Sequence, residues 1–210
     1  MRNASPRDYS FIAPIYDHVF NKPLSEGHRK IGELIHSKKD KRGLKILEVG
    51  VGSGLTFNYL PSHVSYTGID INQKMLNIAE QKAKKLKRKS ISLKVMDAGQ
   101  MDIKDNTFDL VLAPSVLSAM DAPLKGLKEM IRVTKKGGHI AIITNLRTRD
   151  SFKSNMVRWI DPLTRKYLGF RTDMDAAMFE RLRGLKLIEN KQVNNLLGFP
   201  LSSYLLFEKK

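Results

Sequence analysis

Three glycines with alternate spacing follow a short apolar run and could hold a nucleoside. Gly50, Gly52 and Gly54 come directly after residues 45–49, which we predict to be a buried strand containing the acidic residue Glu48. A sharp turn from strand to helix needs positive φ angles, which glycine adopts freely. Without side chains, a ligand can also lie directly on backbone N–H groups. The spacing therefore predicts a nucleotide-binding loop.

Two further acids end apolar runs later in the chain. Asp70 follows the predicted strand 64–69, and Asp97 follows the predicted strand 91–95. An acid after the second strand of such a unit accepts hydrogen bonds from the hydroxyls of a bound ribose. Asp70 is expected to have that role, although each acid could instead be only a helix cap or a turn residue.

The elements that must position these residues alternate along the chain. Strands are expected at 45–49, 64–69, 91–95, 108–113 and 139–144, with helices at 55–60, 73–87 and 117–133. Continuous apolar strands that alternate with helices indicate a parallel sheet covered on both faces. Two more strands, 185–193 and 203–208, follow a short helix near 175–182. No crossover helix separates them, which predicts a hairpin with its loop at 194–200.

The first 43 residues precede this alternation and can cover the ligand as a lid. Residues 7–20 mix aromatic, aliphatic and charged side chains, which predicts a short amphipathic cap in which Pro14 opens a helical turn. A separate helix is expected over residues 24–37. Beyond Asn145, basic and aromatic residues form a helical insert, expected above the carboxyl ends of the strands.

Composition limits the remaining choices. The 210 residues suit one α/β domain, and the absence of cysteine excludes disulfides and thiolate catalysis. No stretch approaches the roughly 18 apolar residues of a membrane span, and the N terminus lacks the apolar core of a signal peptide, so a cytoplasmic location is expected. The 37 basic and 21 acidic residues give a net charge of +16. That surplus suits nucleic acid or an anionic membrane, but a lysine-rich composition with solvated faces explains it equally well.

The glycine spacing resembles one family in particular. Leu55 stands where a dinucleotide-binding loop would have its third glycine, and the set of Glu48, Asp70, Asp97 and a closing hairpin resembles the class I S-adenosylmethionine-dependent methyltransferases. The resemblance implies a doubly wound, mostly parallel seven-stranded α/β sheet with an antiparallel C-terminal hairpin and an N-terminal helical lid. It also implies S-adenosylmethionine as cofactor, S-adenosylhomocysteine as product and no metal. The alternative is an ordinary glycine turn with unrelated acids.

The same resemblance assigns cofactor-binding residues by their positions in the motifs. The glycines would approach the methionyl and ribose parts, Glu48 would order the loop or the amino group, and Asp70 would hold the ribose hydroxyls. The other implied contacts are packing on adenine by Ile71 and Met75, reading of its amino edge by Asp97 and the Ala98 backbone, and Ser115 and Tyr16 near the reacting centre.

A narrower likeness extends over nearly the whole chain. Tyr16-Asp17, the stretch 48–54, Phe108–Pro114, Asp161–Arg165 and Leu168–Asp173 resemble the soluble bacterial phosphatidylethanolamine N-methyltransferases. These are peripheral membrane enzymes that methylate the ethanolamine headgroup up to three times toward phosphatidylcholine. The stretch Thr144-Asn145-Leu146 departs from the family, where Asn-His and an aromatic residue are expected.

This likeness implies a phospholipid substrate and an anionic membrane surface as partners, on the inner face of the cytoplasmic membrane. Tyr16 and Asn145 would be catalytic, and Tyr16, Asp17 and His18 are alternative proton acceptors. Four arginines are candidates for binding the lipid phosphate: Arg147, Arg149, Arg165 and Arg171. Two rivals stay open, a quinone-biosynthesis or other small-molecule methyltransferase and, less favoured, a nucleic-acid-binding protein.

The domain organisation expected from this reading is a single unit over residues 1–210, and we expect a monomer. Residues 1–43 form the lid and membrane-contact segment, 44–144 the cofactor core, 145–183 the substrate-side insert and 184–210 the hairpin.

Overall fold

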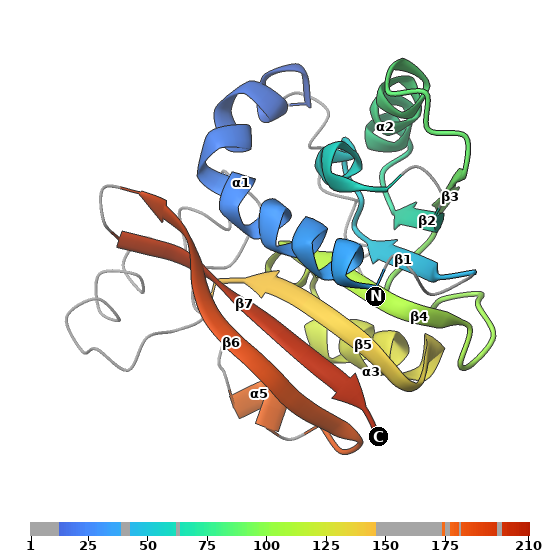
Figure 1. The fold of residues 1–210 in the computed structure, drawn as a ribbon, viewed down its shortest axis with the longest axis vertical. Helices are drawn as coiled ribbons and strands as arrows, with labels where there is room; N and C mark the ends of the chain where they lie inside the picture. Colours follow the sequence, from blue (N-terminus) through green and yellow to red (C-terminus); the bar gives the residue numbers. More distant parts are fainter. Residues whose placement is uncertain are drawn as a thin grey trace, which may run out of the picture.

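The computed structural model describes residues 13–38, 43–61, 64–145, 174, 177–180, 182–196 and 199–210, with the backbone alone for 13–24 and for a few positions of the C-terminal elements. One sheet of seven strands runs through the molecule in the order β3-β2-β1-β4-β5-β7-β6 (Figure 1). The strands are β1 (Lys45–Val49), β2 (Ser65–Asp70), β3 (Ile91–Val95), β4 (Phe108–Pro114), β5 (Thr134–Thr144), β6 (Leu185–Leu196) and β7 (Phe199–Lys209). The helices are α1 (Ala13–Ser37), α2 (Gln73–Lys85), α3 (Pro123–Val133) and α5 (Ala177–Glu180), with the 3₁₀ turns η2 (Leu55–Tyr59) and η3 (Leu117–Ala119).

The strand pairing confirms the predicted fold class. β1 pairs in parallel with β2 on one side and with β4 on the other, so the strand order reverses at β1. Ligands of open α/β sheets bind at the carboxyl ends of the strands beside such a reversal. The last two strands run antiparallel: β7 pairs with β5 and with β6. The sheet is therefore doubly wound and mostly parallel, and it ends in an antiparallel hairpin.

Successive side chains of each strand point to opposite faces of the sheet and build two cores. Ile46 of β1 faces the side covered by α1, η2 and α2, where Ile31 and Phe57 are fully buried. Leu47 faces the other side, where α3 contributes Met130. Figure 1 shows α1 and α3 on these two faces. The glycine loop thus leaves β1 between two packed layers.

Helix α1 is one continuous helix, which corrects the expectation of a short cap followed by a separate helix. It begins at Ala13, with Pro14 in its first turn as predicted, and runs through Pro23 to Ser37. Proline in a helix interior lacks an N–H and crowds the preceding turn, so it kinks a helix. The helix nevertheless continues through Pro23, and its second half is held by contacts with β6.

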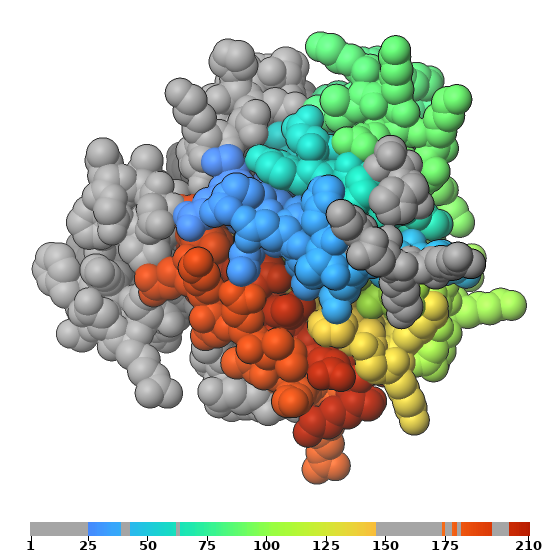
Figure 2. All heavy atoms as spheres, in the orientation of Figure 1, coloured from blue at the N-terminus to red at the C-terminus, as the bar shows by residue number. Residues whose placement is uncertain are grey.

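Asn194 of β6 supplies those contacts. The Gly27 N–H donates to Asn194 Oδ1 at 2.8 Å, and the Asn194 N–H donates to a carboxylate oxygen of Glu26 at 2.8 Å. This is the reciprocal pattern of a capping box, here supplied by another element. Lys30 also pairs with Glu189 of β6 at 3.0 Å. The half of α1 after Pro23 is therefore fixed to the hairpin, and Figure 2 shows it between the hairpin and η2.

Other predicted boundaries need correction. The predicted helix 117–133 is interrupted, because the chain forms η3 and then a new helix at Pro123, a residue favoured at a helix start. β5 begins at Thr134, which pairs with Phe108, earlier than the predicted residue 139. β6 and β7 pair as far as Leu196 and Phe199, so the loop is shorter than the predicted 194–200.

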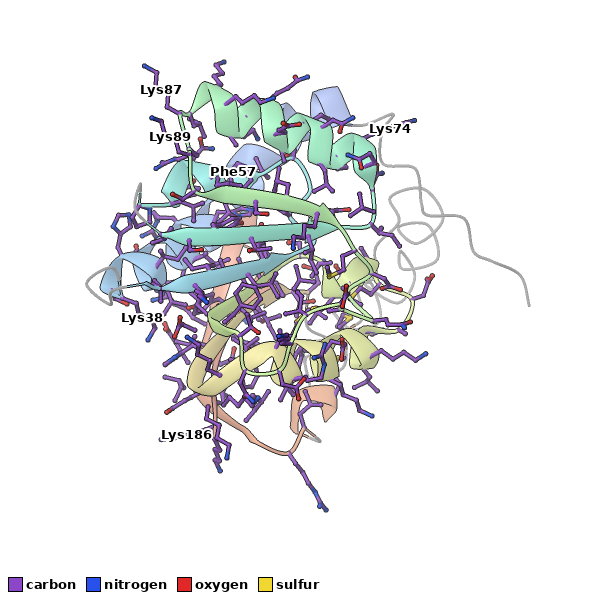
Figure 3. The ribbon with its side chains drawn as sticks, turned by 90° about the vertical axis from the view of Figure 1, so that its right-hand side faces the viewer. Lys38, Phe57, Lys74, Lys87, Lys89 and Lys186 are labelled. Atoms are coloured by element: carbon purple, nitrogen blue, oxygen red, sulfur yellow. The ribbon has the colours of Figure 1, made fainter. Side chains whose placement is uncertain are left out.

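Helix α2 has the predicted start and an earlier end. The Asn72 side chain accepts from the N–H groups of Lys74 and Met75, which confirms it as the N-cap. The helix ends at Lys85. Beyond it Lys87 and Lys89 are exposed and project from this end of the molecule (Figure 3), whereas Arg88 is partly buried. No helix among the residues described is long and apolar enough to cross a membrane.

Candidate active site

The glycine loop after β1 adopts the backbone that its sequence predicts. Gly50, Gly52 and Gly54 have φ angles of 70°, 53° and 77°. The N–H groups of Gly50 and Val51 donate to the Ile69 carbonyl at 2.8 and 3.0 Å, which joins the loop to the end of β2. Residues other than glycine rarely adopt these φ angles. The loop is therefore a fixed turn at the point where β1 and β2 end together.

The three glycines differ in what surrounds them. A Cβ at Gly50 would lie 2.3 Å from Val116 Cγ2, and a Cβ at Gly54 would lie 2.4 Å from the Phe57 ring. A Cβ at Gly52 would meet only Met75 Cε, at 3.5 Å. Phe57 lies inside the molecule (Figure 3). Gly50 and Gly54 thus permit close packing of the protein on itself, whereas the space beside Gly52 is the place where a ligand can approach the backbone.

Asp70 lies directly beside this open position. Its Oδ2 accepts from the Gly52 N–H at 2.9 Å, and its Oδ1 accepts from the Asn72 N–H at 2.9 Å. Burial raises the pKa of the carboxyl group above its ordinary value, and the backbone hydrogen bonds oppose that rise. Each carboxylate oxygen keeps a lone pair for a further donor. The geometry suits the predicted contact with ribose hydroxyls, which stays a prediction.

The residues predicted to surround adenine lie along the same edge of the sheet. Ile71 follows Asp70 and is 55% exposed, which is unusual for a large aliphatic side chain and suits an aromatic ligand. Met75 is buried beneath the loop. Asp97 is exposed and accepts from the Gly99 N–H at 2.7 Å, with Ala98 partly buried beside it. The exposed Ile71 and the acid Asp97 thus follow two neighbouring strands, β2 and β3.

Glu48 lies beneath the loop in a buried hydrogen-bonded group. Its side chain is 1% exposed; Thr56 Oγ1 donates to Oε1 at 3.1 Å, and the Tyr66 hydroxyl donates to Oε2. His28 Nδ1 of α1 lies 3.1 Å from Thr56 Oγ1. Burial raises the pKa of Glu48 to about 8 and lowers the pKa of His28 to about 4. Of the two roles expected for Glu48, these contacts are those of a residue that orders the loop.

Sequence reasoning missed three members of this group: His28, Thr56 and Tyr66. One signal was available for Tyr66, because a buried tyrosine hydroxyl usually needs a hydrogen-bond partner, and strand 64–69 offers none of its own. The acid Glu48 on the neighbouring strand was the natural candidate. His28 lies in a helix distant in sequence, so no local pattern linked it to the loop.

Two further predicted site residues, Ser115 and Asn145, directly follow β4 and β5. Ser115 has a φ angle of 63°, which is uncommon for a residue other than glycine and is often found at functional sites. Its N–H donates to the Ile143 carbonyl at 2.8 Å. Asn145 follows β5, and its Oδ1 accepts from the Ser202 hydroxyl of β7 at 3.0 Å. The amide of Asn145 is thus oriented by the hairpin.

Several predicted residues cannot be placed as side chains. Tyr16 belongs to α1, for which only the backbone is described at that position. The predicted lipid-binding arginines all lie outside the described residues: Arg147, Arg149, Arg165 and Arg171. Within the part of the chain that is described, no group of three or more His, Asp or Glu side chains could hold a metal ion.

The sheet order and the glycine loop define a Rossmann-like domain, and the geometry where β1 and β2 end suits a nucleoside. The residues present fit S-adenosylmethionine. The open space at Gly52 accepts a ligand against the backbone, Asp70 faces that space, and Ile71 offers an apolar surface to a base.

Comparison with known proteins identifies the family. The methyltransferase domain family matches residues 47–142. Phosphatidylethanolamine N-methyltransferase of Cereibacter sphaeroides is 35% identical over 144 residues, which are 68% of this chain and 68% of that protein. Demethylmenaquinone methyltransferase of Bacteroides fragilis is 33% identical over 150 residues, which are 67% of this chain but only 59% of that protein. The chain belongs to the class I S-adenosylmethionine-dependent methyltransferases, and S-adenosylmethionine is its cofactor.

A solved structure supports the fold independently. The S-adenosylmethionine-dependent methyltransferase of Aquifex aeolicus superposes with a TM-score of 0.63 over 96% of this chain and 97% of that one. Its sequence identity of 20% supports the fold alone.

Proposed function

We propose that this methyltransferase acts on the amino group of phosphatidylethanolamine, and of its mono- and dimethylated forms, at a membrane surface. The observation that carries the proposal is the 35% identity to a phosphatidylethanolamine N-methyltransferase, which extends over two thirds of both chains. The net charge of +16 agrees with it, because each basic residue near an anionic bilayer contributes about 1 kcal/mol of attraction.

When bound, S-adenosylmethionine supplies a methyl group that passes from a sulfonium to a nucleophile in one in-line displacement. The chain's own residues supply binding, orientation and exclusion of water. Gly52 and Asp70 hold the nucleoside, and the helix that contains Tyr16 covers the site as a lid. An aromatic face beside the sulfonium and the substrate ammonium would favour these cations by roughly 0.5 to 2 kcal/mol.

The amine must be neutral to act as a nucleophile, so the enzyme must accept a proton. Tyr16, Asp17 and His18 on the first turns of α1 are the candidate acceptors, either directly or through water. Asn145, oriented by Ser202, would position the amine by a hydrogen bond. The arginines at 147, 149, 165 and 171 would bind the lipid phosphate, whose oxygens match the guanidinium fork.

Methylation of a quinol ring carbon is the second candidate. The 33% identity to demethylmenaquinone methyltransferase over a stretch of similar length favours it. A quinol carries no phosphate, so the four arginines would then have no equivalent role. Its ring carbon loses a proton when it is methylated, so a proton acceptor is needed for either substrate.

A direct assay separates the two substrates. The full chain is incubated with S-adenosylmethionine labelled on its methyl group and with vesicles of phosphatidylethanolamine and phosphatidylglycerol, or with a reduced demethylated naphthoquinone in detergent. We expect label in mono-, di- and trimethylated ethanolamine lipids, separated by chromatography. Labelled quinol with no labelled lipid, from enzyme that binds the cofactor, would refute the proposal and support the second candidate.

Arginine variants test the substrate side of the same assay. Arg165→Ala should lower methylation of the lipid by about tenfold at saturating cofactor, because a charged hydrogen bond to phosphate is lost. Lys186→Ala is the matched control, since Lys186 is an exposed cation on β6 at the far end of the molecule from Lys74 (Figure 3). Equal activity of both variants would argue against phosphate recognition by Arg165.

A further inference from the structure

A chain of four buried polar side chains crosses the molecule beneath the glycine loop. It runs from Tyr66 on β2 through Glu48 on β1 and Thr56 on η2 to His28 on α1. Their exposed fractions are 1%, 1%, 0% and 7%. Buried polar side chains are costly unless each has a partner, so the complete chain of contacts favours one arrangement of the four elements.

Thr56 is the link between the two halves of this chain. Its hydroxyl contacts both a Glu48 oxygen and His28 Nδ1, each at 3.1 Å. A hydroxyl donates one hydrogen bond and accepts others, so Thr56 can join the acid to the imidazole in either protonation state of Glu48. It lies two residues after Gly54, within the turn that closes the glycine loop.

Aromatic contacts fix the same turn from both sides. The Phe57 ring meets the Tyr66 ring edge-on, with centroids 5.6 Å apart, and Tyr59 stacks on His28 at 6.4 Å. The half of α1 that contains His28 is itself held by Asn194 of β6, whose side chain accepts from the Gly27 N–H. The turn η2 therefore packs between β2 and the second half of α1, and Asn194 joins that half of α1 to the hairpin.

Burial favours the neutral forms of these four side chains near pH 7. Burial, with a further contribution from Lys82 of α2, lowers the pKa of His28, and burial, with a further contribution from Asp70, raises the pKa of Glu48. Tyr66 is likewise kept protonated by burial and by Glu48, which raise its pKa. Hydrogen bonds among neutral groups in such a dry interior are strong and directional.

We propose that Thr56 and His28 are positioning residues for the cofactor: they fix η2 against α1 and so hold the glycine loop in the shape that accepts the nucleoside. The loop and α1 are then energetically coupled, and α1 also contains Tyr16, twelve positions before His28 and about 18 Å along the helix axis. The inference depends on the cofactor and not on the identity of the methyl acceptor.

The first test measures affinity for S-adenosylhomocysteine by calorimetry on the full chain. Thr56→Val keeps the shape of the side chain and removes the hydroxyl, and we expect about tenfold weaker binding, a typical size for coupling through a packed network. Thr56→Ser keeps the hydroxyl and should bind within about threefold of the original chain. Thr134→Val is the control, because Thr134 is equally buried and donates to the Met130 carbonyl at 2.6 Å away from the loop.

The second test asks whether the two residues act together. His28→Phe keeps a ring to stack on Tyr59 and removes the hydrogen bond, whereas His28→Asn keeps a polar group near the position of Nδ1. We expect His28→Phe to weaken binding by about as much as Thr56→Val, and the double variant to be no weaker than either alone. His28→Asn should recover part of the loss.

The outcomes separate positioning from mere stability. A positioning role is supported if Thr56→Val and Thr134→Val lower the thermal midpoint alike while only Thr56→Val weakens affinity well below that temperature. The proposal is overturned if Thr56→Val binds S-adenosylhomocysteine as tightly as the control does. It is also overturned if the effects of His28→Phe and Thr56→Val simply add. Should Thr56→Val not fold, His28→Phe against His28→Asn makes the same comparison.

Discussion

The edge of the sheet at the amino ends of its parallel strands and the edge at their carboxyl ends hold acidic residues in different surroundings. At the amino ends of the strands, acids lie beside cations: Asp109 accepts from Lys135 Nζ at 2.9 Å, and Arg132 pairs with Asp105 and Glu129 at 2.6 and 2.7 Å. At the carboxyl ends, Glu48 and Asp70 accept hydrogen bonds from hydroxyls and backbone N–H groups.

The pKa shifts follow this difference. Hydrogen bonds from Arg132 lower the pKa of Glu129. Burial raises the pKa of Glu48 to about 8, and it also raises that of Asp70. An acid that is paired with a cation of the protein contributes to stability, whereas Asp70 is held by backbone N–H groups and keeps lone pairs for a ligand. The comparison therefore assigns folding stability to one edge and cofactor binding to the other.

The largest expected effect comes from Gly50. In Gly50→Ala the new Cβ would lie 2.3 Å from Val116 Cγ2, in addition to the strain of a positive φ angle. We expect affinity for S-adenosylhomocysteine to fall by more than about a hundredfold, since the loop must shift to relieve the overlap. Calorimetry measures it.

Gly137→Ala is the control for that variant. Gly137 has the same φ angle of 70°, but a Cβ there meets nothing within 4 Å, and it lies at the amino-end edge. It should lose about 1 kcal/mol of stability from strain alone and none of its affinity. Equal losses of affinity in the two variants would contradict the assignment of cofactor binding to the carboxyl-end edge.

Asp70→Asn should weaken cofactor binding by about a hundredfold, because hydrogen bonds from two ribose hydroxyls to a charged acceptor are lost. Its stability should fall by about 1 kcal/mol, because the amide nitrogen of asparagine cannot accept the hydrogen bond that one carboxylate oxygen receives from the Gly52 or Asn72 N–H. Asp105→Asn removes an equal charge from the opposite edge and should bind the cofactor normally. Unchanged affinity in Asp70→Asn would mean that the ribose lies elsewhere.

Arg132→Gln should have the reverse profile. The Arg132 side chain donates to Glu129, to Asp105 and to the carbonyls of Met101 and Ile103. We expect a loss of about 2 kcal/mol in urea unfolding and no change in affinity, because these contacts join α3 to the loop before β4. Arg183→Gln, at an exposed arginine, provides the baseline. A weakened affinity in Arg132→Gln would show that the amino-end edge also shapes the site.

The elements at the carboxyl ends of β1 and β2 could be predicted from the sequence, because the signals for them lie within a few residues of one another. Glycines at alternate positions, an acid after an apolar run and Asn72 as a helix cap each act within a few residues, and the structure has the loop, the strand end and the cap where they were predicted. The alternation of strands and helices also sufficed for the sheet and its closing hairpin.

The contacts that link distant segments could not be predicted in this way. The pairing of His28 with Thr56, and of Gly27 with Asn194 across 167 positions, depends on how α1 packs on the finished sheet. The interruption between η3 and α3 was not predicted because the apolar spacing suggested one helix. Proline disfavours helical backbone at the residue before it, so Pro123 was a signal for this interruption. Patterns within an element predicted its type, and packing between elements decided the rest.

The two edges should also differ in how their acidic residues make stability depend on pH. The folded chain holds a proton on Glu48 up to about pH 8, whereas an unfolded chain releases it near 4.5. Unfolding therefore releases a proton between these values, and stability should fall as pH rises through that window, by at most about 1.4 kcal/mol per pH unit. Glu129 has the opposite sign: its lowered pKa adds stability above its unfolded value, which is lost as pH falls through the folded value. Up to about pH 6.5 His28 opposes the slope that Glu48 causes, because its lowered pKa makes stability rise with pH over that range. Urea unfolding from pH 3 to 8 should then show Glu48→Gln removing the fall in stability between about pH 6.5 and 8, and Glu129→Gln removing the slope at acid pH. If Glu48→Gln kept the slope of the original chain, the buried acid at the binding edge would not be the group that titrates, and its contrast with Glu129 would fail.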